Sequence, residues 1–108
     1  MTEIARYRFF AHPVRYTSLA LAVCEAMTIG LPVVGLATTE LPRIIAESGG
    51  GYVDNEVSRL IAVSLDLLRD RGAADDLSRG ARAYARERFA IERFAADWDA
   101  VFREVCGA

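Results

Sequence analysis

The chain has 108 residues, 53% of them hydrophobic, which is enough for one domain with a modest core. Its net charge of −2 at pH 7 argues against a nucleic-acid partner, and a glutamate, a glycine and a proline interrupt its most apolar window, Leu19 to Ala37, which excludes a membrane span. Cys24 and Cys106 lack the pattern of a disulfide framework, so we expect reduced thiols and a cytoplasmic location.

The first 36 residues predict a strand, a helix and a second strand. Tyr7 to Ala11 is a short aromatic run typical of a buried strand, and His12, the single histidine, is expected in the loop beside the following proline. Tyr16 to Gly30 predicts a short helix, and Leu31 to Leu36 is a continuous apolar run typical of a parallel strand covered on both faces. Together these segments predict a right-handed βαβ unit.

The predicted helix is apolar on nearly every side except for one carboxylate. Thr17 and Ser18 are N-cap residue types, and Gly30 is a typical helix stop. A helix that is apolar all round is expected to be buried on all sides, so Glu25 needs polar partners. Two roles stay open: a core carboxylate paired with one of the thirteen arginines, or an acceptor for ligand hydroxyls. Ser18 and Glu25 lie on one helix face about 10 Å apart, which suits a ligand with an anion at the helix N-terminus and hydroxyls near Glu25.

A second short helix and a third strand are predicted next. Thr39 is expected to cap a helix over residues 40–47, with Pro42 in its first turn. The triple glycine that follows is interpreted as a helix stop and turn rather than a phosphate loop. A phosphate loop follows a strand and opens a helix, whereas this one follows a helix and opens a strand over residues 51–53.

Three amphipathic helices are predicted over the remaining residues. Asp54 or Asn55 is expected to cap the first of them. In the second, over about 73–89, Gly80 suggests a close helix contact. The third has apolar residues at helical spacing, with Trp98 as a core anchor. The predicted core face of the first helix consists of Val57, Leu60, Ile61, Leu65 and Leu68.

One face of the second of these helices carries several arginines. They are Arg79, Arg82 and Arg86, with Arg93 nearby. We interpret them as a solvated face interleaved with carboxylates, and weak contact with an anionic membrane surface is the alternative.

The loops after the first two strands form the predicted binding site. Ligands of open α/β sheets bind beyond the carboxyl ends of the strands, where residues 12–17 and 37–40 would face each other. The sequence has no Ser/His/Asp or Cys/His set, no metal-ligand cluster and no paired carboxylates. It therefore favours electrostatic binding of a diphosphate-like group, without a metal, over nucleophilic catalysis. The polar residues in these loops are Thr17, Ser18, Thr38, Thr39 and Glu40.

The motif E-A-M-x-x-G-x-P-V-V, from Glu25 to Val34, resembles the signature of retaining glycosyltransferases of family 4, also called group 1. In that family E-G-F-G-L-x-x-x-E precedes A-M-A-x-G-x-P-V-V. The later stretches I-x-E-x-G-x-G-Y-V, L-L-x-D and A-R-x-x-A-R-E-R-F also fit, so the resemblance covers essentially the whole chain. It implies the GT-B fold, with two Rossmann-like domains and a nucleotide-sugar donor bound by the C-terminal one.

The resemblance implies an α/β partial Rossmann-like domain, with a small parallel sheet, flanking helices and a helical C-terminus. Residues 1–108 resemble only the last part of the C-terminal domain, without the acceptor-binding domain or the upstream basic residues that hold donor phosphates. We therefore interpret the Met1 start as a truncation or a gene fragment, and expect the isolated chain to be inactive. Apolar surface along a sheet edge would then favour a homodimer or aggregation.

Residue by residue, the resemblance implies a donor site. Glu25 matches the glutamate that hydrogen-bonds the ribose, and residues 18–21 match the segment whose N–H groups approach the sugar and pyrophosphate. Three positions depart from the family: Thr17 replaces its first glutamate, Thr39 and Glu40 replace its paired glycines, and Arg43 replaces an acidic residue. The predicted donor-binding residues are Thr17, Ser18, Leu19, Ala20, Leu21, Glu25, Thr38 and Thr39.

The resemblance leaves the donor sugar, the nucleotide base and the acceptor open. A non-catalytic binding or scaffolding module of the same fold is the main alternative to a transferase. A nucleotide-sugar epimerase, which shares the GT-B architecture, is the other.

Overall fold

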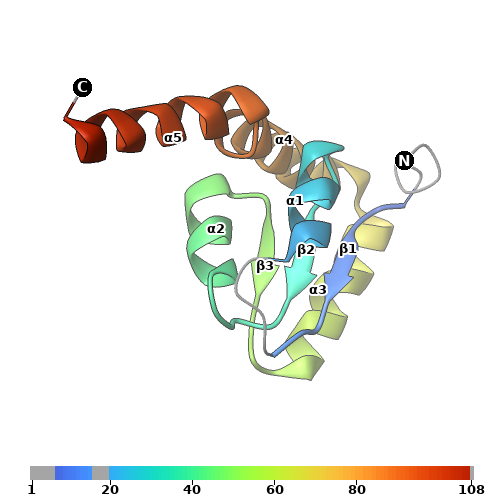
Figure 1. The fold of residues 1–108 in the computed structure, drawn as a ribbon. Coiled ribbons are helices and arrows are strands. Elements are labelled where there is room, and N and C mark those ends of the chain that lie inside the picture. Colours follow the sequence, from blue (N-terminus) through green and yellow to red (C-terminus); the bar gives the residue numbers. More distant parts are fainter. Residues whose placement is uncertain (1–6, 16–19, 108) are drawn as a thin grey trace.

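The computed structural model describes residues 7–15 and 20–107, which form a three-stranded parallel sheet with flanking helices (Figure 1). The strands follow the order β1-β2-β3, with Phe10 opposite Val33 and Val33 opposite Gly51. This arrangement confirms the predicted α/β class and is consistent with a partial Rossmann-like domain. The elements are β1 (Phe10–His12), α1 (Leu21–Thr28), β2 (Val33–Gly35), α2 (Leu41–Ser48), β3 (Gly51–Val53), α3 (Val57–Arg69), α4 (Arg71–Arg88) and α5 (Ile91–Cys106).

Both faces of the sheet are covered, and the central strand β2 contributes to both cores. Successive side chains of a strand point to opposite faces, so Val33 and Val34 enter different clusters. On the first face, Val33 packs with α1, α2 and the second half of α4, through Val23, Met27, Leu41, Ile44, Ile45, Ala81 and Ala85. On the second face, Val34 packs with Leu60 and Leu67 of α3, together with Leu36 after β2 and Ala74 of α4.

Helix α1 ends as predicted but begins later than predicted. Gly30 has φ +88°, and the N–H groups of Gly30 and Leu31 donate to the carbonyls of Met27 and Ala26, which is a Schellman motif. At the other end, extended Ala20 is the N-cap and provides no side-chain cap. The prediction that Thr17 or Ser18 caps this helix is therefore wrong.

Only one side of α1 is buried, so the prediction of burial on all sides is also wrong. Helix α1 contacts α4, β1 and β2, and its buried Val23 and Met27 belong to the core of the first face. The buried residues are Val23, Ala26 and Met27. The exposed residues are Leu21, Ala22, Glu25 and Thr28.

His12 is the last residue of β1 rather than a loop residue. Its carbonyl accepts the Leu36 N–H at 3.4 Å, and its ring stacks on Phe10 with centroids 5.8 Å apart. The residue is only 8% exposed, and burial lowers the pKa of its imidazole. Because His12 pairs with Gly35 of β2, the strand continues up to the residue before Pro13. The prediction of a loop at His12 is therefore wrong.

The turns around α2 follow the predicted pattern with shifted caps. Glu40, not Thr39, is the N-cap of α2, and Gly49, with φ +62°, ends the helix. Gly80 allows a close approach of α4, because a Cβ there would lie 2.5 Å from the Ser48 carbonyl oxygen. The close contact expected at Gly80 is therefore made with the end of α2.

Glu56 is the N-cap of α3, which corrects the prediction of Asp54 or Asn55. Asp54 instead stabilises the turn before the helix, because its carboxylate accepts the Glu56 N–H at 2.8 Å. This backbone hydrogen bond is the main cause that lowers the pKa of Asp54.

Two of the predicted core faces are largely exposed. In α3, Leu60 and Leu67 are buried, whereas Val57, Ile61, Leu65 and Leu68 are exposed. Helix α5 has no buried residue and extends away from the sheet, so Trp98 is not a core anchor (Figure 1). Helical periodicity identifies an apolar stripe but not the element that covers it.

None of the helices in the described part of the chain has the length and hydropathy needed to cross a bilayer.

Candidate functional site

The loops that leave β1 and β2 are hydrogen-bonded to each other at the carboxyl edge of the sheet. The Thr38 hydroxyl donates to the Val14 carbonyl at 2.8 Å. Because β1 and β2 are parallel neighbours, both loops emerge at the same edge, where α/β sheets bind their ligands. The structure thus places Thr38 directly beside the loop that leads toward the predicted donor segment.

Thr39, the residue after it, has a strained backbone. Its φ of +54° lies in the left-handed region, where a β-branched residue is disfavoured by about 1–2 kcal/mol. The turn around it is tight, because the Thr38 N–H donates to the Leu36 carbonyl and the Leu41 N–H donates to the Thr38 carbonyl. Thr39 therefore occupies a position that favours glycine, which agrees with the glycine that the resemblance implies there.

Two residues of the predicted donor segment, Ala20 and Leu21, belong to the described residues and lie at the start of α1. Thr17, Ser18 and Leu19 lie outside those residues. Ala20 is extended and lacks a side-chain cap, and Leu21 opens the helix with 72% of its surface exposed. A helix N-terminus without a side-chain cap presents N–H groups and the positive end of the helix dipole to an anion.

Glu25 lies on the exposed side of α1, one turn after its start. Within residues 7–15 and 20–107, no arginine pairs with its carboxylate and no donor hydrogen-bonds to it. The interpretation as a buried core carboxylate in an ion pair is therefore wrong. The Glu25 side chain is exposed on α1, and it lines neither of the two cavities described below.

A cavity of about 240 Å³ opens at the carboxyl edge of the sheet. It is lined by Arg15 after β1, Leu36 and Thr38 after β2, and Asn55 after β3. Of these, sequence reasoning identified only Thr38 as a site residue. Arg15 and Asn55 could have been found from their position, because each belongs to a loop that leaves the carboxyl end of a parallel strand.

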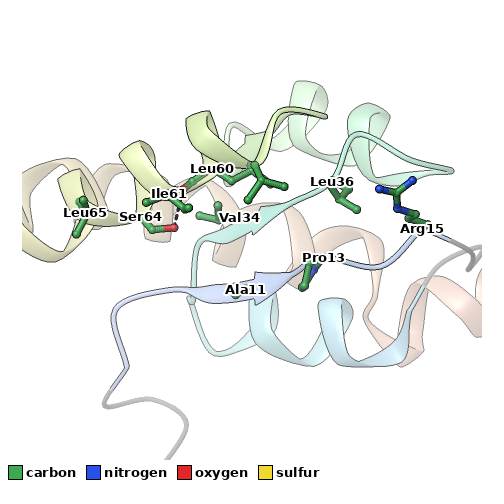
Figure 2. Close-up of a pocket in the computed structure, with 10 residues that line it drawn as sticks. Ala11, Pro13, Arg15, Val34, Leu36, Leu60, Ile61, Ser64 and Leu65 are labelled. Atoms are coloured by element: carbon green, nitrogen blue, oxygen red, sulfur yellow. Dashed lines mark hydrogen bonds between the residues drawn. The ribbon is translucent and has the colours of Figure 1, made fainter.

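A larger cavity of about 430 Å³ lies between α3 and the β1–β2 part of the sheet (Figure 2). It shares Arg15 and Leu36 with the smaller cavity. Sequence reasoning missed it, since the apolar residues of α3 were assigned to the core. The remaining lining residues are Ala11, Pro13, Val34, Val57, Leu60, Ile61, Ser64 and Leu65.

Carboxylates already engage the two other arginines at the starts of α2 and α3. Arg43 lies 2.5 Å from Glu40, and Arg59 lies 3.2 Å from Glu56 and 3.4 Å from Asp54. These pairs leave little positive charge near either helix start.

Within the described ranges no group of three or more His, Cys, Asp or Glu side chains gathers to hold a metal ion.

The arginine-rich face of α4 is mostly engaged by protein groups. Arg79 pairs with Asp76, Arg82 donates to the Ile29 carbonyl at 3.3 Å, and Arg93 pairs with Asp97 at 3.2 Å. The proposed contact with an anionic membrane surface stays a prediction.

Comparison with known proteins gives two matches. The family model described as glycosyl transferases group 1 matches residues 2–70, which include every element from β1 to α3. O-antigen chain mannosyltransferase B of Escherichia coli is 35% identical over 66 residues, which are 61% of this chain and 17% of that relative. The match therefore spans less than a fifth of the relative's length. No solved structure matches the chain.

Proposed function

Because the chain belongs to the glycosyl transferases group 1 family, we propose that it provides the donor side of a glycosyltransferase. In this proposal a sugar passes with retention from a nucleotide-diphospho-sugar to an acceptor. The observation that carries it is the family match over residues 2–70, which includes both carboxyl-edge loops and α1. The donor contacts would come from Thr17, Ser18, Leu19, Ala20, Leu21, Glu25, Thr38 and Thr39.

The described part of the site supports diphosphate binding at the start of α1. Ala20 and Leu21 provide an N-terminus without a side-chain cap at the end of the loop from β1. Backbone N–H groups and the helix dipole stabilise a diphosphate without any metal ion or catalytic side chain.

Glu25 supports binding of the nucleotide ribose. Its exposed carboxylate lacks a partner within residues 7–15 and 20–107, so its oxygens are available to accept hydrogen bonds from two vicinal hydroxyls. A carboxylate already paired with arginine would have to lose that ion pair first. Its position in the second turn of α1 keeps it close to the helix start, where the diphosphate is proposed to bind.

Isothermal titration calorimetry of the chain with nucleoside diphosphates and a nucleotide-diphospho-mannose tests this proposal. The mannosyl probe is chosen because the similar bacterial protein is a mannosyltransferase. Glu25→Gln should weaken binding about ten- to a hundredfold, because one or two charge-assisted hydrogen bonds are lost. Glu104→Gln on exposed α5 is the matched control and should bind as the wild type does. Equal affinities of the Glu25 variant and the wild type would refute the ribose contact.

A non-catalytic module of the same fold is the second candidate. Thr17 replaces the glutamate that the family resemblance implies for the donor sugar, so sugar recognition would be weakened while nucleotide binding persists. Equal affinities for a nucleoside diphosphate and its sugar conjugate would favour this module. A preference for one nucleotide-sugar would favour the transferase. We further propose that turnover requires the acceptor-binding domain, so the chain alone should bind donor without transferring it.

A further inference from the structure

The cavity beneath α3 has the size and lining of a ligand site. Its volume of about 430 Å³ falls within the range of about 300–1,000 Å³ that is common for small-molecule pockets. Val34 of β2 and Leu36, which directly follows that strand, face Leu60 and Ile61 of α3 across it (Figure 2). Ile61 is 56% exposed and Leu65 is 43% exposed, so apolar surface also borders its opening.

Among the residues that line this cavity, Arg15 alone is charged, and it is exposed to solvent. The Ser64 hydroxyl donates to the Leu60 carbonyl at 2.7 Å and therefore does not call for a ligand group. Arg15 lies at one end of the cavity, beside Leu36 and opposite the Leu65 end (Figure 2). In the described part of the chain no carboxylate pairs with Arg15, whereas carboxylates engage Arg43 and Arg59 at the neighbouring helix starts.

We propose that this cavity binds a single-chain amphiphile with one anionic head group. The alkyl chain would lie between Val34, Leu36 and Ile61, and the head would pair with Arg15 where the two cavities meet. Burial of the alkyl chain provides the affinity, and a charge-assisted hydrogen bond to the guanidinium fixes its direction. The site goes beyond the proposed function and does not depend on it: its lining contains none of the proposed donor residues, although Thr38 lines the smaller cavity beside Arg15.

Two features favour an amphiphile over a purely apolar or a purely anionic ligand. An alkane would make no use of Arg15, whose guanidinium is exposed and stays hydrated beside the apolar lining. A free phosphate would leave the apolar lining exposed to water and would bind only through one partly solvated arginine. A ligand with an alkyl chain and an anionic head group would contact both the apolar lining and the Arg15 guanidinium.

Calorimetric titration of the chain with alkyl phosphates below their micelle concentrations tests this assignment. Each methylene that enters the cavity should raise the affinity about fourfold. Decyl phosphate should therefore bind about 16-fold more tightly than octyl phosphate, with one molecule per chain, and inorganic phosphate should not bind measurably. Equal affinities for the two alkyl phosphates would overturn the alkyl part of the site.

Variants separate the head group from the chain. Arg15→Gln should weaken decyl phosphate about tenfold or more but leave decanol unchanged, because only the ionic contact is lost. Arg59→Gln is the charge-matched control, since Arg59 is engaged by Asp54 and Glu56 and does not line the cavity. If Arg15→Gln and Arg59→Gln bind decyl phosphate equally, the head assignment is wrong.

The chain part of the site has its own pair of variants. Ile61→Glu should abolish binding of both decyl phosphate and decanol, and it should fold because Ile61 is more than half exposed. Val105→Glu on α5, where the side chain is 78% exposed, is the matched control and should bind both ligands normally.

Light scattering decides whether a second copy of the chain occupies the cavity instead. A dimer that Ile61→Glu dissociates and that binds no alkyl phosphate would overturn the proposal. A monomer that binds decyl phosphate supports it. No nucleotide is present in these titrations, so their failure leaves the donor site standing, and failure of the Glu25 test leaves this site standing.

Discussion

Arg43 pairs with Glu40 across the first turn of α2, with 2.5 Å between Nη2 and Oε2 and 2.7 Å between Nε and Oε2. Both residues replace family residues in the motif comparison, a glycine at 40 and an acidic residue at 43. The two charges introduced by these departures therefore pair with each other. Hydrogen bonding to Glu40 is also the main cause that raises the pKa of Arg43. Arg43 also lies 3.6 Å from Glu47, so its guanidinium is shared by two carboxylates of this region.

Thr39→Gly should stabilise the fold. Removing the Cβ relieves the strain of φ +54°, worth about 1–2 kcal/mol, and the greater freedom of glycine in the unfolded chain returns about 0.5–1 kcal/mol of that. The net gain of about 0.5–1 kcal/mol should be measurable by urea unfolding. Thr38→Gly is the control and should destabilise, because it loses the hydrogen bond to Val14. A loss of stability in Thr39→Gly would mean that the side chain of Thr39 contributes more than its strain costs.

Gly80→Ala should destabilise the fold although alanine is the better helix former. The new Cβ would lie 2.5 Å from the Ser48 carbonyl oxygen, so α4 would have to move away from the end of α2. Overpacking of this kind costs about 1–3 kcal/mol, which exceeds the helix propensity gain of about 1 kcal/mol. Gly72→Ala, near the start of the same helix, meets only a side-chain oxygen of Asp70 at 3.3 Å and is the matched control. Thermal unfolding of both variants should rank Gly80→Ala below the wild type and Gly72→Ala near it.

Trp98→Ala should have little effect on stability. Trp98 is 48% exposed on a helix without buried residues, and its aromatic neighbours Phe94 and Phe102 lie on the same helix. We expect a loss below about 1 kcal/mol. Met27→Ala should instead cost about 2–5 kcal/mol, because Met27 is fully buried between the sheet and the helices of the first face. Comparable losses in urea unfolding of these two variants would show that α5 is packed against the chain in solution.

Stability should fall as the pH drops through the titration range of His12. Burial lowers the pKa of His12 in the folded state below its unfolded value of about 6.5, so the unfolded chain binds more protons in that range. The stabilisation is therefore complete above about pH 6.5 and is lost as the pH falls through the folded pKa. His12→Gln should flatten the dependence between about pH 7.5 and 5.5 in urea unfolding. An identical slope in wild type and variant would exclude His12 as the titrating group.

Local sequence signals were sufficient for the element order and for the C-terminal ends of α1 and α2, but not for the N-caps of α1, α2 and α3. Gly30 and Gly49 end α1 and α2 as predicted, because a left-handed residue after a helix is a local requirement that glycine meets most easily. The three short apolar runs became parallel strands, since continuous apolar runs separated by helices cannot form hairpins. The resemblance of Glu25 to Val34 to the group 1 signature likewise predicted the family, and the family match confirms it.

The tertiary structure decided which apolar faces are covered and which loop residues meet. The stripes of α1, α3 and α5 have the helical period of core faces, yet their burial depends on elements that no local signal specifies. Thr38 and Val14 come together only because β1 and β2 are parallel neighbours, and the same placement puts Arg15 beside both cavities. Periodicity is a property of a few consecutive turns, whereas burial and cavities arise from contacts between segments distant in the sequence.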